Sequence, residues 1–405
     1  MTADITLRGP GDVVAILPYQ LGYHPHDSVV VISLKGKRVG LVARADLPPE
    51  RFVGDVVASL MGPLVRDGAT SVILVGYEDV PDASQPLLLD LVEQLEQARI
   101  DVVDVAVVRE GRRYSPICSE PCCPPDGVEL PDPADVPGVA EYVALGRSPL
   151  RSRSDVEGLV APEPWRCLGV ARAVASRARM PRRRRRSVAA WSVLLDRSEK
   201  GRRPLDRAVV ADLALGLADI PWRDGLIAWL VPSVLPTDKI DRTVLALLGS
   251  ALPTWGGMGP GAAQPFGLRL APEGVRPASQ WGGPAGPAAG EAGDDSAGRG
   301  GAAREQAERE PLSVEREDLL HRLLVLCRSV PDECPDLAAA VCTVAAHVAW
   351  VGGDGAIARA AVERALRLAP EYRLAQLLVQ LVDIGLRLPS VTAQADRPST
   401  LGEAG

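Results

Sequence analysis

The sequence predicts an α/β domain in the N-terminal half, with helices packed on a mixed sheet that contains a β-hairpin, followed by an all-α region. Three observations lead to this prediction. Two β-branched runs flank Gly36, two more apolar runs follow with a helical pattern between them, and helical patterns dominate after residue 139. The chain has 405 residues, which suits two or three domains.

The N-terminal elements are expected in the order helix, hairpin, helix, strand, helix, strand. Residues 12–21 read as a short helix capped by Asp12. The runs 29–34 and 38–47 form a hairpin, because Gly36 takes a positive φ at no steric cost. Helices and strands then continue to alternate. Because a right-handed crossover through a helix returns the chain beside the preceding strand, the strands on either side of a helix are expected to be parallel neighbours. These later elements are a helix at 49–66, a strand at 71–77, a helix at 83–99, a strand at 101–108 and its hairpin partner at 112–117.

Composition divides the rest of the chain. Residues 282–303 are almost entirely Gly, Ala and Pro with scattered charges, so they bury too little apolar surface to offset the entropy of ordering. The expected segments are an α/β domain at 1–138, a helical region at 139–256, a disordered Gly/Ala/Pro-rich linker at 257–311, a C-terminal helical region at 312–389 and a disordered tail at 390–405. The C-terminal helices are expected at 313–330, 336–351, 355–368 and 372–388.

Net charge and targeting signals narrow the class of protein. The formal charge is −7, which argues against a generic nucleic-acid binder. The N-terminus lacks the pattern of a signal peptide, and no apolar run approaches the length of a membrane span. Seven cysteines without a secretion signal suit a reducing compartment, so we expect a cytoplasmic protein without membrane contact.

The first candidate site lies where the hairpin strands meet the loop at 22–28. A two-residue turn at Lys35-Gly36 would place Asp27 opposite Arg44, and a three-residue turn would place Ser28 there. Asp46 follows on the same face. Asp27, Ser28, Arg44 and Asp46 are therefore ligand-binding candidates for an anionic group or a small substrate, and the alternative is a salt bridge that ties the loop to the hairpin, since ion pairs at strand ends are common. His24 and His26 lack a third ligand in sequence reach and read as exposed loop residues.

The second candidate site is a cysteine cluster after the last predicted strand. Cys118, Cys122 and Cys123 form C-x3-C-C, and thiolates are ligands for zinc and for iron–sulfur clusters. Adjacent cysteines rarely both reach one ion, and no second CxxC knuckle exists, so structural packing is the alternative. Zinc is the cofactor that this cluster would take.

The third candidate site is a basic stretch. Residues 151–203 hold fifteen Arg and Lys against five Asp and Glu, and the run comprises Arg182, Arg183, Arg184, Arg185 and Arg186. Such a run could contact nucleic acid or an acidic partner. Because a helix is expected to start just after Pro181, these cations would face its positive dipole end, which is unfavourable unless an anion is present. A solvated charged face is the alternative.

Four sequence patterns resemble an actinobacterial family known as domain of unknown function 4192. They are L-R-G-P-G-D-V-V-A-x-L-P-Y-x-L-G-Y-x-P-x-D-S-V-V-V, R-V-G-L-V-A-R-A-D-L-P, C-x3-C-C-P-P-D-G and G-D-G-A-x-A-R-A-A-V-E-R-A-L. The resemblance implies a cytoplasmic protein without an assigned activity. It also implies that Asp27, Ser28, Arg44, Asp46 and the Cys122-Cys123 pair belong to the family pattern, whereas the two loop histidines do not.

The pair of helices at 339–372 resembles a single tetratricopeptide-type unit. Small residues at Ala346, Ala358 and Ala365 would let two helices approach closely, and Pro370 closes the unit. A peptide-binding groove needs about three such repeats, so a simple packed hairpin is the alternative.

Two classes of function remain after these observations. The first is a binding or regulatory protein whose helical half contacts a protein partner. The second is an enzyme or small-ligand binder with a pocket at the 22–28 loop, Arg44 and Asp46. The first is favoured because no nucleophile–base pair is legible, and nucleic-acid contact through Arg182–Arg186 is a third hypothesis. Whether the chain is an enzyme is left open.

Overall fold

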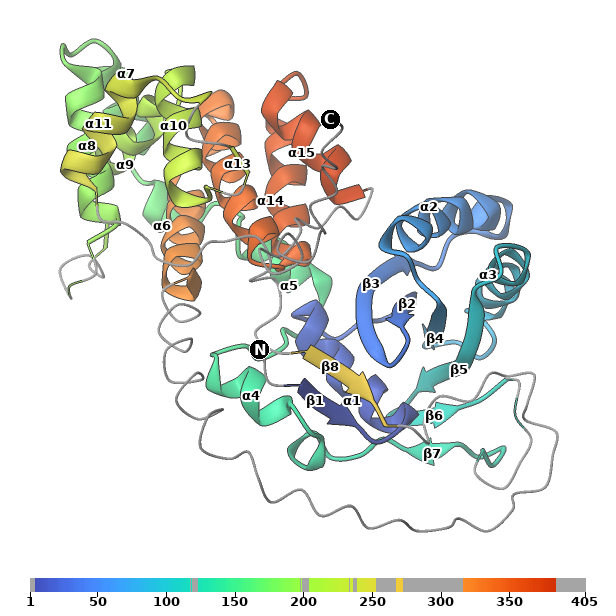
Figure 1. Cartoon of the computed structure of the whole chain (residues 1–405). Coiled ribbons are helices and arrows are strands. Elements are labelled where there is room, and N and C mark those ends of the chain that lie inside the picture. The colour runs from blue at the N-terminus through green and yellow to red at the C-terminus, as the bar shows by residue number, and fades with distance from the viewer. Residues whose placement is uncertain are drawn as a thin grey trace, which may run out of the picture. The chain divides into compact units, whose positions relative to one another are not determined.

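The computed structural model forms two compact units (Figure 1). Unit 1 comprises Met1–Arg153, Phe266–Arg309 and Asp383–Gly385, and unit 2 comprises Ser154–Pro265, Glu310–Val382 and Leu386–Gly405. The structure describes residues 4–116, 118, 123–196, 198, 204–232, 234–235, 239–252, 267–271 and 316–383.

Unit 1 is built on a mixed sheet, which confirms the predicted fold class. Its described strands are β1 (Asp4–Leu7), β2 (Ser28–Lys35), β3 (Arg38–Asp46), β4 (Ser71–Tyr77), β5 (Asp101–Arg109), β6 (Arg112–Tyr114), β7 (Val128–Glu129) and β8 (Gly267–Leu270). They lie in the order β1-β8-β3-β2-β4-β5-β6-β7. β4 and β5, which a helix connects in the sequence, pair in parallel, as the crossover rule predicts. β1 and β8 also pair in parallel.

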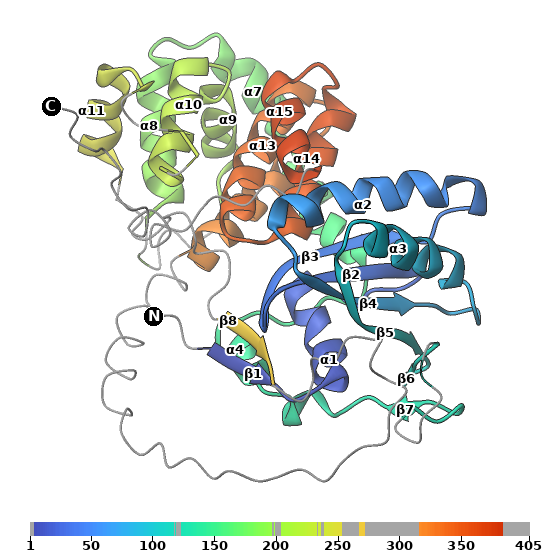
Figure 2. The same ribbon diagram turned by 45° about the vertical axis from the view of Figure 1, so that its right-hand side comes forward.

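Helices cover both faces of this sheet (Figure 2). On one face α2 (Val53–Asp67) and α3 (Gln85–Gln97) pack on an apolar cluster that includes Val29, Val31 and Leu74. On the other face α1 (Pro10–Leu21) and α4 (Val139–Ala144) pack on a second cluster that includes Val30 and Ile32. Consecutive residues of β2 thus serve opposite cores, because side chains alternate along a strand. This explains why β2 reads as an unbroken apolar run.

The β2–β3 hairpin confirms that the runs flanking Gly36 pair with each other. Its turn consists of Gly36 and Lys37, since Lys35 pairs with Arg38. The register then shifts between the pairs of Ile32 and Leu34, which marks a β-bulge. The Asp67 carboxylate, at the end of α2, accepts a hydrogen bond from Leu41 N at 3.1 Å beside this irregularity.

Two N-terminal details differ from the prediction. β1 precedes α1, although no strand was predicted there, because four residues are too few to show a periodicity. α1 begins at Pro10, so Asp12 lies in its first turn instead of capping it, and the Asp12 carboxylate accepts hydrogen bonds from Arg8.

The strand β8 lies inside the segment predicted as a linker, and its partners β1 and β3 are more than two hundred residues away. The rest of that linker and the predicted tail lie outside the described residues.

Unit 2 is all-helical in its described part (Figure 1). Its first helices are α5 (Arg153–Gly158), α6 (Pro164–Cys167), α7 (Val170–Ala178), α8 (Arg183–Leu194), α9 (Arg207–Gly216), α10 (Ile220–Leu230) and α11 (Arg242–Ala251). Residues 316–329 are helical, and α13 (Pro335–Val351), α14 (Gly355–Leu368) and α15 (Arg373–Asp383) follow. Among the described helices, none combines the length and apolar character needed to cross a bilayer.

The helices α13 and α14 pack as a hairpin, as the small residues predicted. Ala346, Ala358 and Ala365 are fully buried between neighbouring helices. Arg364, only 1% exposed, stabilises the ends of the surrounding helices. Its guanidinium donates to the carbonyls of Val160, Cys327 and Val330 and pairs with Asp332 at 2.7 Å. The likeness of this hairpin to a tetratricopeptide unit remains a resemblance.

Candidate functional site

The loop and hairpin residues of unit 1 meet at the end of the β2–β3 hairpin opposite its turn, an edge formed by strand ends, but not in either predicted register. Ser28 lies opposite Asp46, and Val30 lies opposite Arg44. Both predicted pairings, Asp27 with Arg44 and Ser28 with Arg44, are therefore wrong. The cause is the combination of the Gly36-Lys37 turn with the bulge, which shifts every pair beyond it.

Arg44 is the centre of this edge. Its side chain is 9% exposed, whereas that of Asp46 is 64% exposed. Arg44 Nη1 lies 2.5 Å from Asp46 Oδ1 as an ion pair, and Nη2 donates to the His26 carbonyl at 3.1 Å. Arg153 pairs with the other oxygen of Asp46 at 3.0 Å. Arg44 Nε and Ser28 Oγ are buried and have no hydrogen-bond partner. The edge is thus an ion-pair network with two unpartnered donors.

Asp27 accepts hydrogen bonds from backbone N–H groups and does not pair with Arg44. Its carbonyl accepts from Leu47 N at 2.9 Å, and its carboxylate accepts from Asp79 N at 3.2 Å. Its φ of 37° is unusual for a residue other than glycine. His26 Nδ1 lies 4.0 Å from the Asp79 carboxylate, and both side chains are exposed. These contacts fix the loop at the start of β2.

The cysteine cluster lies away from Arg44. Cys118 and Cys123 are half-buried beyond β6, and β2, β4 and β5 separate that strand from β3. Cys122 is outside the described residues. Within the residues that are described, no three His, Cys, Asp or Glu side chains form a group that could hold a metal ion. Zinc binding by the full cluster stays a prediction.

The arginine run of unit 2 begins α8, as the sequence suggested. Arg182 is the N-cap residue with a left-handed φ of 59°, and no side chain caps the helix. Arg184 donates to the Asp219 carboxylate at 3.0 and 2.6 Å. Arg186 donates to the Asp212 carboxylate at 3.0 Å. Two of the five arginines therefore have fixed carboxylate partners.

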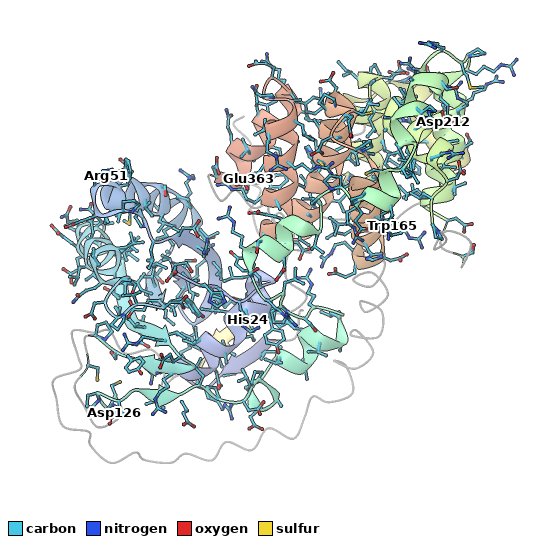
Figure 3. All side chains as sticks on the ribbon, turned by 180° about the vertical axis from the view of Figure 1, so that it is seen from behind. His24, Arg51, Asp126, Trp165, Asp212 and Glu363 are labelled. Carbon is cyan, nitrogen blue, oxygen red and sulfur yellow. The ribbon has the colours of Figure 1, made fainter. Side chains whose placement is uncertain are left out.

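Asp212 is the carboxylate that joins three helices of this unit. It lies in α9, is 5% exposed, and pairs with Arg177 of α7 as well as with Arg186 of α8 (labelled in Figure 3). Burial opposes its ionisation, but the hydrogen bonds and charges of the two arginines outweigh burial and lower the pKa of Asp212. Arg177 and Arg186 are therefore structural cations.

The remaining arginines at the α7–α8 junction face solvent. We call Arg179, Arg182, Arg183 and Arg185 the basic corner; all four are exposed. Within the described part of the chain, no ion pair links them to a carboxylate. Four unpaired cations within seven residues form a local positive region in a chain whose net charge is −7.

A hollow of about 350 Å³ opens beside the basic corner. It is lined by Arg183, Arg184, Gly216, Ala218, Asp219 and Trp222. Sequence reasoning missed this hollow, because its walls come from α8 and from the α9–α10 connection, which lie some thirty residues apart. The only sequence signal was the helix start at Asp219, whose carboxylate accepts from Trp222 N at 3.4 Å.

Together the fold and these sites define a protein of two units, one a three-layer α/β unit and the other a helical unit with a basic corner. The chain belongs to the family described as Domain of unknown function (DUF4192), whose model matches residues 10–247 and 302–388. This confirms the family resemblance. No curated protein matches the chain, and no solved structure matches it.

Proposed function

We propose that this protein is a binding protein whose helical unit contacts an acidic protein partner through the basic corner. The observation that carries the proposal is the set of four exposed arginines at the α7–α8 turn, for which the described residues provide no carboxylate partner. Arg186 stabilises this turn by donating to the Arg177 carbonyl at 2.8 Å and to the Asp212 carboxylate. The backbone of the corner is thus held in place, which removes the entropy cost of ordering the turn on binding.

An acidic protein surface fits the corner better than a nucleic acid does. Nucleic-acid binders usually carry a basic stripe and a high isoelectric point, whereas the isoelectric point here is about 5.4. Two arginines of the run are already neutralised by Asp212 and Asp219. A short cluster of positive charge suits a few carboxylates in an acidic segment rather than a continuous phosphate backbone.

A labelled oligoglutamate peptide tests this proposal by fluorescence anisotropy at low and high salt. We expect binding that weakens with salt and that falls at least about tenfold when Arg179, Arg182, Arg183 and Arg185 are all changed to Gln, since each exposed charge pair contributes roughly 0.5 kcal/mol. The matched control changes Arg367 and Arg373, which are exposed elsewhere in unit 2. Equal binding by the quadruple variant contradicts the proposal, and tighter binding of a single-stranded RNA of the same charge favours a nucleic-acid role instead.

A second candidate function is small-ligand binding at the sheet edge of unit 1. It is favoured by the buried, unpartnered Arg44 Nε and Ser28 Oγ, which are donors that a ligand oxygen would satisfy. A thermal-shift titration with mono- and dicarboxylates at constant ionic strength tests it. Stabilisation that disappears in Arg44→Gln supports a ligand site, whereas no stabilisation leaves this edge as an internal ion-pair network.

A further inference from the structure

The start of α8 is electrostatically incomplete. The first backbone N–H groups of a helix lack partners within the helix, and they carry the positive end of its dipole. At α8 no side chain caps these groups, and the first turn consists of arginines instead of the acidic residues that stabilise such a position. Arg182 also holds a left-handed backbone conformation, which costs free energy in a residue with a side chain. An anion at this place would offset all three costs.

The hollow beside α8 contains a second, independent sign of a missing acceptor. Trp222 is 1% exposed, and its indole N–H has no hydrogen-bond partner. Gly216 lies directly against this group: a Cβ there would lie 3.2 Å from Trp222 Nε1, and the Ser187 hydroxyl occupies the place that the Cβ would take. Ser187 Oγ is also buried without a partner. Two unpartnered donors therefore meet at Gly216, a residue that lines the hollow.

The acidic side chain in the lining, Asp219, is already paired. Both hydrogen bonds from Arg184 go to Asp219 Oδ2, while Asp219 Oδ1 accepts from the first turn of α10. In the described part of the chain Arg183 has no carboxylate partner at the hollow, and its Nη2 donates to the Ala178 carbonyl at 3.4 Å. The volume of about 350 Å³ falls at the lower end of small-ligand sites, which run from roughly 300 to 1,000 Å³.

We propose that the hollow at the start of α8 binds a phosphate monoester, with the phosphate on Arg183 and the first N–H groups of α8 and with the Trp222 indole N–H as a further donor. Helix N-termini with nearby arginines recognise phosphate because backbone donors and the dipole act on the same oxygens. The inference deepens the proposed function, since a phosphorylated side chain in an acidic partner segment would fill the hollow while its carboxylates meet the basic corner. A free phosphorylated metabolite has the same chemistry.

The indole N–H resonances of the full-length protein provide the test. Inorganic phosphate is titrated at constant ionic strength, and the Trp222 signal is assigned by its loss in Trp222→Phe. We expect a saturable downfield shift of that signal. Arg183→Gln is expected to weaken phosphate binding at least about tenfold, because it removes a charge-assisted hydrogen bond to the phosphate. Arg367→Gln, with an unchanged affinity, is the control, and circular dichroism confirms that each variant folds.

The outcomes separate this inference from the proposed function. A Trp222 signal that does not move, or that moves equally with chloride, overturns the phosphate site even if oligoglutamate binds the corner. Phosphate binding without oligoglutamate binding keeps the site and rejects the acidic-partner proposal. A phosphoserine peptide that binds more tightly than its unphosphorylated form and than adenosine monophosphate identifies a protein source, and the reverse order identifies a metabolite.

Discussion

His347 makes the stability of the helical unit depend on pH, and the size of this effect follows from its burial. The imidazole lies in α13, is 4% exposed, and its Nδ1 is 2.8 Å from the Thr343 carbonyl, so Nδ1–H donates this bond in the neutral ring. Burial is the main cause that lowers its pKa to about 4. The nearby Arg223 also lowers the pKa, whereas Asp224 and the bond to Thr343 oppose the change.

The sign of the pH effect follows from this lowered pKa. In the unfolded chain His347 titrates near the ordinary value of 6.5, so between pH 6.5 and about 4 the unfolded state binds more protons than the folded state. Stability is therefore fully present above that interval and is lost as the pH falls. The loss between about pH 7.5 and about pH 5 is roughly 2 kcal/mol, and the limit well below pH 4 is about 3 kcal/mol.

Urea unfolding followed by tryptophan fluorescence measures this loss. Six of the seven tryptophans belong to unit 2 and Trp281 belongs to unit 1, so the signal reports mainly on unit 2. The comparison is between the wild type and His347→Gln, which cannot titrate, with His24→Gln in unit 1 as the control. We expect the difference in unfolding free energy between about pH 7.5 and about pH 5 to be roughly 2 kcal/mol smaller in His347→Gln. Equal pH dependence in the two proteins would refute the reasoning.

Three further substitutions test other buried positions. Burial raises the pKa of Asp104. The stability of unit 1 should therefore fall as the pH rises from the pKa of Asp104 in the unfolded chain to its pKa in the folded protein. Asp104→Asn should flatten this pH dependence, which urea unfolding followed by circular dichroism measures. Arg364→Met removes the partner of three buried carbonyls and Asp332 and should cost about 3–5 kcal/mol of unfolding free energy, with Arg364→Lys retaining part of it; a loss under ~1 kcal/mol would show that the contacts are dispensable. Gly216→Ala overlaps the Ser187 hydroxyl and should cost about 1–3 kcal/mol in chemical unfolding, so an unchanged midpoint would mean that the helices separate easily.

The architecture of unit 1 was largely predictable from local patterns. The pairing across Gly36 and the parallel β4–β5 pair followed from turn chemistry and from an apolar run on each side of a helix. β1 and β8 escaped prediction, because each has four residues and they pair with each other and with β3 across most of the chain. Short strands are stabilised by partners that local sequence does not specify.

The candidate sites, like the architecture, were predictable from the sequence only in part. The sequence identified Arg44 and Asp46 on one strand face, since side chains two residues apart on a strand share a face. It could not specify the partner residues across the hairpin, because a single bulge shifts the register. The hollow at Trp222 could not be predicted from the sequence at all, because its walls come from separate helices whose packing depends on the buried Asp212 carboxylate.

The sequence by itself determined the fold class, the family, the hairpin and the arginine run at a helix start. Each depends on spacing along the chain, and spacing is a local property. The tertiary structure alone decided which arginines are neutralised and which remain free, because Asp212 and Asp219 reach Arg186 and Arg184 only after α8, α9 and α10 pack. Ion pairing acts over a few ångströms in space, so its outcome appears only when the chain is folded.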